Sequence, residues 1–248
     1  MSLSAVLITH NAASQLPACL DSVRFADDIV VVDSGSTDDT LQICNRPGVR
    51  VIKKEWMGFG PQKQFAVENA AHDWVLCIDA DERVSEALRE SIRRELRAPR
   101  SAAFQIARRN RFLGRWLGHG EGYPDWNLRL FDRRHARWTP DPVHEKVVTD
   151  VAVARVDGDL LHDSAETLDA YLQKQNRYTS LQAEQLHLSG MRGGVARLLI
   201  SPVARFLKFY FFRLGFLDGL PGFIHIMIGC MNAFNKYAKL IALGRAGA

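Results

Sequence analysis

The chain has 248 residues, of which 47% are hydrophobic and 24% charged, an ordinary balance for a globular protein with a proper core. Its four cysteines are scattered without a C-x-x-C pair, which excludes a disulfide framework and favours a reducing compartment. The net charge of +4 hides two basic zones, because residues 93–115 and 191–248 each hold eight basic residues against one acid. Anionic partners are therefore expected at particular places, with no nucleic acid among them.

Short apolar runs at 5–9, 29–33, 49–52 and 74–79 are expected to be buried strands. Apolar residues at helical spacing follow the first run, and a helix is expected over 61–71. Strands that alternate with helices predict βαβ units and a mostly parallel sheet, which is an α/β fold. No basic leader precedes the first strand, so no signal peptide is expected.

The regular alternation is lost in the second half of the chain. A helix is expected over 85–96, and the Gly-rich segment 118–124 is expected to be a flexible loop and a candidate lid. The chain is expected to be helical from residue 167 onward. Further short strands are expected at 103–106, 126–131 and 146–148.

Acids end two of the expected strands, at the edge where parallel sheets bind ligands. Asp33 ends one strand, and Asp79 ends another with Asp81 close behind. Such a sheet could bind a dinucleotide, but G-x-G-x-x-G, G-x-x-x-x-G-K-[ST] and G-x-S-x-G patterns are absent. Carboxylate oxygens are the ligands that Mg²⁺ and Mn²⁺ prefer, so a cation on Asp79 and Asp81 is expected to hold phosphates.

Three motifs together, Thr9-His-Asn11, Asp33-Ser-Gly-Ser-Thr-Asp38 and Asp79-Ala-Asp81, resemble those of the family 2 inverting glycosyltransferases. The resemblance implies the GT-A fold, with Asp33 on the nucleobase, Asp79 on the ribose and Asp81 on a Mg²⁺ or Mn²⁺ ion that bridges the diphosphate. Many GT-A enzymes use a late histidine as a further metal ligand, for which His162 is the candidate; a structural, hydrogen-bonded histidine is the alternative. Roles in binding the nucleotide-sugar donor are expected for Thr9, Asn11, Asp33, Ser34, Gly35, Lys63 and Asp79.

Inverting transfer is a single displacement and needs a general base to deprotonate the acceptor hydroxyl. Pro124-Asp125-Trp126 to Arg129 resembles the acid-tryptophan-arginine segment of the family, although many members carry two consecutive acids there. Asp125 is therefore the favoured base, and Glu145 beside His144 is the rival. Arg129 could hold a phosphate or simply face solvent. Glu82 could orient the site, or serve only as an acid at a helix N-terminus.

Within the family, the chain resembles the lipopolysaccharide core β-1,4-glucosyltransferase group. The resemblance rests on the Asp125 to Arg129 segment, on Val143-His-Glu145 and on a basic, aromatic tail. It implies transfer of a sugar, expected to be glucose from UDP-glucose, to a lipopolysaccharide inner-core or related glycolipid acceptor. Two other classes stay open: a nucleotidyltransferase on a similar sheet, and an inactive, membrane-docked protein that binds nucleotide sugars.

The tail combines aromatic and basic residues, and two domains are expected: a catalytic domain over 1–165 and a helical region over 166–248. The longest nearly uncharged run of the tail, 219–234, is shorter than the roughly 20 residues a spanning helix needs. Helices lying in an anionic membrane surface are expected instead, which implies a peripheral or monotopic enzyme on the cytoplasmic face of the inner membrane. Packing on the core or a dimer interface is the alternative.

Overall fold

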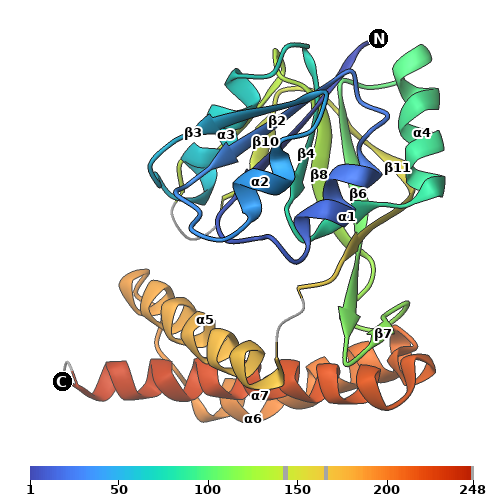
Figure 1. Ribbon diagram of the computed structural model, residues 1–248. Helices are drawn as coiled ribbons and strands as arrows, with labels where there is room; N and C mark the ends of the chain where they lie inside the picture. The colour runs from blue at the N-terminus through green and yellow to red at the C-terminus, as the bar shows by residue number, and fades with distance from the viewer. Residues whose placement is uncertain (142–144, 165–166, 247–248) are drawn as a thin grey trace. The chain divides into compact units, whose positions relative to one another are not determined.

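The protein divides into two compact units in a computed structural model that describes residues 1–141, 145–164 and 167–246 (Figure 1). The first, called the sheet unit, comprises Met1–Arg108 and Trp126–His162. The second, called the helical unit, comprises Arg109–Asp125 and Asp163–Ala248. Residues 109–125, which the sequence places in the first domain, thus cluster with the C-terminal helices.

The first half of the sheet consists of the four strands expected from the sequence. They are β1 (Leu3–Thr9), β2 (Asp28–Asp33), β3 (Val49–Lys53) and β4 (Trp74–Asp79). β1 pairs in parallel with β2 and β4, and β2 pairs in parallel with β3, so the four carboxyl ends share one edge. The apolar sequences of β1, β2 and β4 are buried along nearly their whole length, as a sheet covered on both faces requires.

The second half makes the sheet mixed. It holds β5 (Glu82–Val84), β6 (Ala103–Phe112), β8 (Asp125–Asp132) and β11 (Val153–His162). β8 runs antiparallel to β4, and β11 runs antiparallel to β5. Over the described ranges nine strands form one sheet in the order β3-β2-β1-β4-β8-β6-β11-β5, and β7 (Arg115–Trp116) pairs with β6. A separate antiparallel pair joins β9 (Ala136–Trp138) to β10 (Val147–Thr149).

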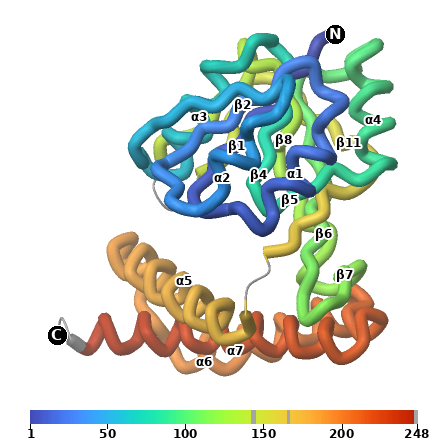
Figure 2. The backbone as a smooth tube through the Cα atoms, viewed as in Figure 1, coloured from blue at the N-terminus to red at the C-terminus, as the bar shows by residue number. Residues whose placement is uncertain are grey.

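Helices cover both faces of this sheet, as Figure 2 shows. One face packs against α1 (Leu16–Ser22), α2 (Thr40–Cys44) and α4 (Glu86–Arg97), and the other packs against α3 (Phe59–Glu68). Ser85 caps α4 by accepting a hydrogen bond from the backbone N–H of Leu88 at 3.3 Å. The result is a three-layer α/β unit with its core on either side of β1 and β4.

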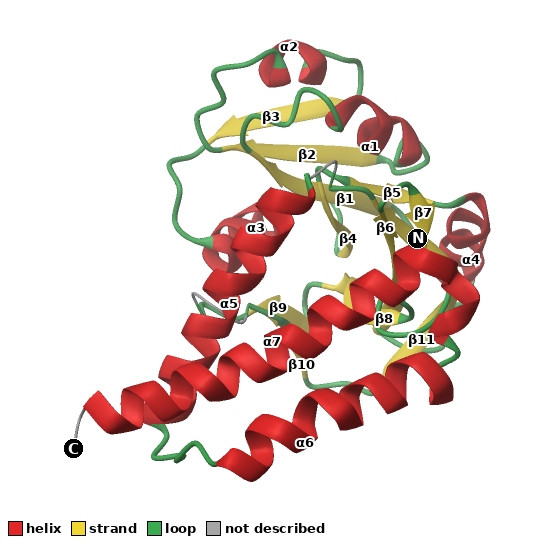
Figure 3. Ribbon diagram, turned by 90° about the horizontal axis from the view of Figure 1, so that it is seen from below, coloured by secondary structure: helices red, strands yellow, loops and turns green. Residues whose placement is uncertain are grey.

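The helical unit is built around the long helix α7 (Gly219–Ala246). α5 (Leu168–Leu188) and α6 (Val195–Phe206) both pack along it (Figure 3). A π-helical turn, η1 (Leu207–Phe212), and a 3-10 turn, η2 (Gly215–Asp218), connect α6 to α7. In the described part of the chain one helical stretch, Gly215–Arg245, is long and apolar enough by composition to cross a membrane, with 39% of its apolar window buried.

Candidate functional site

The loops after β1 and β2 are hydrogen-bonded to each other. The backbone N–H of Ser34 donates to the carbonyl of Thr9 at 3.0 Å. Asn11 has φ +50°, its N–H donates to Ser36 Oγ at 2.9 Å, and its Oδ1 accepts from the N–H of Thr37 at 2.8 Å. Asparagine tolerates this left-handed conformation better than most residues, which fits its place here. Two motifs far apart in sequence therefore form one surface at the carboxyl ends of the strands.

Asp33 is fully buried and fixes the turn that follows β2. Its Oδ1 accepts hydrogen bonds from the N–H groups of Gly35 and Ser36, both at 3.0 Å, and its Oδ2 accepts from the Ser36 hydroxyl. Gly35 has φ +91°, a conformation in which a side chain would be strained. Ser34 Oγ accepts from Gln62 on α3 at 3.1 Å, so α3 is joined to the same turn.

Asp79, at the end of β4, lies between two cations from different elements. Lys63 Nζ on α3 is 3.1 Å from its Oδ1, and Arg129 Nη2 on β8 is 2.8 Å from its Oδ2. Burial would raise the pKa of Asp79, but the charges of Arg129 and Lys63 outweigh it and hold the pKa well below its usual range. The backbone N–H of Asp79 donates to Glu82 Oε2 at 2.9 Å, so Glu82 orients the end of the strand.

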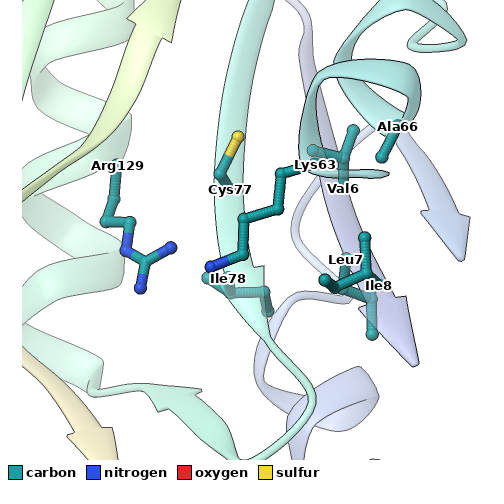
Figure 4. Close-up of a pocket in the computed structure, with 8 residues that line it drawn as sticks. All are labelled: Val6, Leu7, Ile8, Lys63, Ala66, Cys77, Ile78 and Arg129. Carbon is teal, nitrogen blue, oxygen red and sulfur yellow. The ribbon is translucent and has the colours of Figure 1, made fainter. Parts of the chain in front are cut away.

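A ring and a small cavity accompany these two cations. Trp138 lies under both, with its ring centroid 4.8 Å from Lys63 Nζ and 5.5 Å from the Arg129 guanidinium carbon. Figure 4 shows Lys63 and Arg129 reaching toward each other across β4. Two buried nitrogens of Arg129, Nε and Nη1, have no hydrogen-bond partner among the described residues. The cavity, about 10 Å³ or room for about one water, is lined by Val6, Leu7, Ile8, Lys63, Ala66, Cys77, Ile78 and Arg129.

The structure brings Asp81 and His162 together although 80 residues separate them in the chain. His162 Nε2 lies 3.1 Å from Asp81 Oδ2, because β11 pairs with β5 in a register that places His162 opposite Glu82. Adjacent ligands of an octahedral cation with bonds of about 2.1 Å lie about 3 Å apart, so this spacing fits two ligands of one Mg²⁺ or Mn²⁺ ion. In the described ranges no cluster of three or more His, Cys, Asp or Glu side chains could hold a metal ion.

The two candidate bases fall in different parts of the molecule. Glu145 belongs to the sheet unit, where its Oε1 lies 3.6 Å from Lys63 Nζ. Its sequence neighbour His144 lies outside the described residues. Asp125 is the first residue of β8 and clusters with the helical unit, while Trp126 after it belongs to the sheet unit. Since β8 is antiparallel to β4, Trp126 lies toward the edge of the sheet where β4 ends.

Sequence reasoning missed Trp138 and underrated Arg129. The contacts of both residues join segments that are far apart in the chain. The sequence near Trp138 carries no motif that would have predicted its contacts with Lys63 and Arg129. Arg129 alternates with apolar residues, which made a solvent-facing side chain the simpler interpretation. In the structure it is 4% exposed. A charged residue almost never becomes that buried unless it is paired.

A sheet with helices on both faces and polar loops at the carboxyl ends of its parallel strands agrees with the GT-A fold that the sequence motifs imply. Residues 4–156 match the family described as Glycosyl transferase family 2, and the chain belongs to that family. It is 36% identical over 96% of its length to the lipopolysaccharide core biosynthesis glycosyltransferase LpsC of Rhizobium meliloti, of which it covers 91%. It is 31% identical to an uncharacterized glycosyltransferase of Rickettsia typhi, over 96% of this chain and 86% of that protein.

Among solved structures, the chain resembles TarS 1–349 of S. aureus in complex with UDP-GlcNAc. The TM-score is 0.51 at 15% sequence identity, with 99% of this chain and 92% of that chain covered. At this identity the likeness speaks for the fold alone, and the fold agrees with the GT-A class expected from the sequence.

Proposed function

We propose that the protein is an inverting glycosyltransferase that moves a sugar from a nucleotide-sugar donor to a lipopolysaccharide inner-core or related glycolipid acceptor. The observation that carries the proposal is the arrangement at one edge of the sheet: Asp33 in a rigid turn, Asp79 between two cations, and Asp81 beside His162. The similarity to LpsC, a lipopolysaccharide core biosynthesis glycosyltransferase, supports the acceptor class. Glucose from UDP-glucose is the donor that the sequence resemblance favours.

In this proposal the donor lies across the ends of β1, β2 and β4. The buried, fixed carboxylate of Asp33 accepts hydrogen bonds from the nucleobase, beside a surface formed by Thr9, Asn11, Ser34 and Gly35. Asp79 accepts from the ribose. Lys63 and Arg129 hold Asp79 ionised, and Lys63 offers a positive charge to the diphosphate. The site thus binds an anion and a polar ring without a glycine-rich phosphate loop.

Asp81 and His162 are the residues that would hold a divalent cation, Mg²⁺ or Mn²⁺. Two protein ligands suffice, since such ions are commonly bound by one or two carboxylates together with substrate phosphates. When bound, the ion would stabilise the negative charge of the departing diphosphate.

Replacing Asp81 with Ala tests the metal site and the reaction together. We expect transfer from UDP-glucose in the presence of Mg²⁺ or Mn²⁺ to fall at least a hundredfold, because the cation loses its carboxylate ligand. The fold should be retained, since Asp81 lies on the surface of the sheet edge and is half-buried. Release of nucleoside diphosphate is the measurement. Release of pyrophosphate instead would indicate a nucleotidyltransferase, and nucleotide binding without any turnover in the unmodified protein would indicate an inactive binding protein.

The base is expected to be Asp125, with Glu145 as the alternative. Both Asp125→Asn and Glu145→Gln keep size and polarity but remove the ability to take a proton. We expect the variant of the true base to lose transfer at least a thousandfold while it still binds UDP-glucose, because a base acts in the transition state. Loss of donor binding in Glu145→Gln would instead assign Glu145 to the charge pair with Lys63.

We further propose that the enzyme acts at the cytoplasmic face of the inner membrane, bound through the helical unit as a peripheral or monotopic protein. The unit exposes a series of large apolar side chains close to basic residues, among them Phe212 at 82% and Leu220 at 68% exposure. Lys239 of α7 donates hydrogen bonds to Asn176, Thr179 and Ser180 of α5. Because α7 is bound in this way to a polar helix, we propose that the unit lies on the membrane surface and does not cross the membrane. A glycolipid acceptor resides in such a membrane.

A further inference from the structure

An exposed aromatic segment precedes α3 in the sheet unit. Trp56, Met57 and Phe59 are 50%, 40% and 51% exposed, and the rings of Trp56 and Phe59 meet edge to face with centroids 4.8 Å apart. The segment is nonetheless held in place, because the N–H of Met57 donates to Gln62 at 3.3 Å and Gly58 has φ +96°. Exposed apolar side chains gathered on a fixed backbone mark a binding surface more often than scattered ones do.

The aromatic pair adjoins the charged part of the site. Lys63 Nζ lies 5.9 Å from the centre of the Phe59 ring, 3.1 Å from Asp79 and 3.6 Å from Glu145. At Gly60, a Cβ atom would lie 2.1 Å from the carbonyl oxygen of Thr139 and 3.3 Å from Glu145 Cβ. The first turn of α3 is therefore packed directly against the segment that carries Glu145, and only glycine permits this approach.

Flat rings beside a carboxylate and an ammonium match the chemistry of a sugar. A pyranose ring has an apolar face of C–H groups, which an aromatic surface can cover, and a rim of hydroxyls, which charged groups can bind. We propose that Trp56 and Phe59 form the stacking surface for the acceptor's sugar ring, with one aromatic ring against its C–H face and the other, at right angles, along its side. Glu145 accepts a hydrogen bond from one of its hydroxyls. This inference rests on the proposed function and deepens it by placing the acceptor.

The acceptor fits this surface better than the donor does. Under the proposed function the donor's nucleoside and diphosphate occupy Asp33 and Asp79, whose carboxylates lie at the ends of β2 and β4. Glu145 is a candidate base, and a base must face the acceptor hydroxyl. A sugar ring that covers Phe59 can reach Glu145, because Lys63 Nζ lies 5.9 Å from the centre of the Phe59 ring and 3.6 Å from Glu145 Oε1. Trp56 and Phe59 are then specificity-determining residues for the acceptor.

The test compares Trp56→Ala and Phe59→Ala with Trp56→Phe and Phe59→Tyr, which keep an aromatic face. The probe is a lipid-free inner-core oligosaccharide of lipopolysaccharide, so that membrane binding plays no part. We expect each alanine variant to raise the acceptor KM at least tenfold with kcat within about twofold, because ground-state binding is lost. The aromatic replacements should stay within about threefold of the unmodified protein, and the Kd of UDP-glucose should not change. Val51→Ala, which removes an apolar group that is 38% exposed on β3, serves as the matched control.

Three outcomes would overturn the inference: an unchanged acceptor KM in both alanine variants, a weakened UDP-glucose Kd with an unchanged acceptor KM, or reduced sedimentation with anionic vesicles as the sole effect. Saturation-transfer NMR between the full-length protein and the oligosaccharide keeps the test independent of turnover. If the protein neither binds nor turns over any nucleotide sugar, the proposed function fails. The NMR experiment then tests the stacking surface by itself: loss of the oligosaccharide signal in Trp56→Ala supports it, and an unchanged signal overturns it.

Discussion

Asp28, at the start of β2, shows how a buried acid can stabilise the sheet far from the site. It is 8% exposed and accepts hydrogen bonds from Ser4 Oγ at 2.9 Å, from the N–H of Ala71 at 2.9 Å and from Arg50 Nε at 2.8 Å. Burial alone would raise its pKa, but the hydrogen bonds from Arg50, Ala71 and Ser4 outweigh it, so the pKa of Asp28 lies below its ordinary value. The folded state therefore favours the ionised carboxylate.

Asp28→Asn should lower the free energy of unfolding by about 2 kcal/mol at pH 7, because a charged acceptor is lost in a buried network. Since the folded pKa lies below the unfolded value of about 3.9, the stabilisation is fully present above that value and is lost as the pH falls through the folded pKa. The difference from the unmodified protein should shrink below about pH 4. Urea unfolding between pH 7 and pH 3 measures it. Asp157→Asn, at a side chain that is 89% exposed, should show almost no difference at any pH.

Arg129 compensates a half-buried and a fully buried carboxylate at once, since its Nη2 lies 2.8 Å from Asp79 and 3.5 Å from Glu82. Arg129→Met should lower the free energy of unfolding by roughly 3 kcal/mol, because it leaves Asp79 with Lys63 alone and the buried Glu82 with Arg108 alone, at 3.8 Å. Adding Asp79→Asn should restore part of that loss, which a double-mutant cycle from urea unfolding measures. Strictly additive losses would contradict a direct interaction. Arg137→Met on the exposed side of β9 is the matched control.

At the scale of elements, the loop between β7 and β8 is tied down by the helices of its own unit. The buried carboxylate of Asp218 accepts hydrogen bonds from the N–H groups of Gly118 and His119, at 3.0 and 2.8 Å. The N–H of Gly120 donates to the carbonyl of Arg213 at 2.8 Å, and Glu121 forms an ion pair with Arg205 of α6. The sequence suggested a flexible loop here. The helices hold it instead, a few residues ahead of Asp125.

Asp218→Ala should release this loop, because three hydrogen bonds to its backbone and to the His119 ring end on one carboxylate. Limited proteolysis of the full-length protein should then cut within 118–123 at least tenfold faster, while the sheet unit stays intact. Asp169→Ala, at an exposed acid of the first turn of α5, is the control. Equal cleavage rates in the two variants would mean that other contacts hold the loop.

Local sequence patterns were enough to predict β1, β2 and β4, but not all of the remaining strands of the sheet. Those strands are continuous apolar runs, and their acids fall at the strand ends by local pattern alone. β11 was not expected, because it carries Asp157, Gly158 and Asp159, residue types depleted in strands. Gly158 is needed there, since a Cβ atom would lie 2.3 Å from the backbone nitrogen of Leu88 on α4. His162 was expected to be a metal ligand from its place in the sequence, and its position beside Asp81 follows from the β11–β5 register.

At the scale of the whole molecule, the two units carry different chemistry. The sheet unit holds the described residues expected to bind the donor and the metal, together with Glu145 and the proposed stacking surface. The helical unit holds Asp125, the basic C-terminal zone and the exposed apolar side chains of α6, η1 and the start of α7. The division into 1–165 and 166–248 expected from sequence could not include residues 109–125 in the second unit, because their contacts with Asp218 and Arg205 span 84 to 100 residues.

We predict that the whole molecule attaches to a membrane through the helical unit. Phe212 and Leu220 are 82% and 68% exposed. Arg213 directly follows Phe212 and Lys208 lies in the same π-helical turn, so apolar and basic groups can meet an anionic surface together. Phe212→Ser combined with Leu220→Ser should reduce affinity for vesicles containing phosphatidylglycerol at least tenfold, because burying each such side chain contributes about 1.5–3 kcal/mol.

Co-sedimentation of the full-length protein measures that affinity, and raising the salt concentration should weaken it further, since screening reduces the attraction of basic residues to anionic lipid. Leu188→Ser provides the matched control, because Leu188 is 85% exposed at the end of α5, away from this stretch of chain. If the double variant and the control sediment alike, the exposed side chains serve another contact, such as a second copy of the chain. Analytical ultracentrifugation without lipid would then show a dimer that Phe212→Ser and Leu220→Ser dissociate.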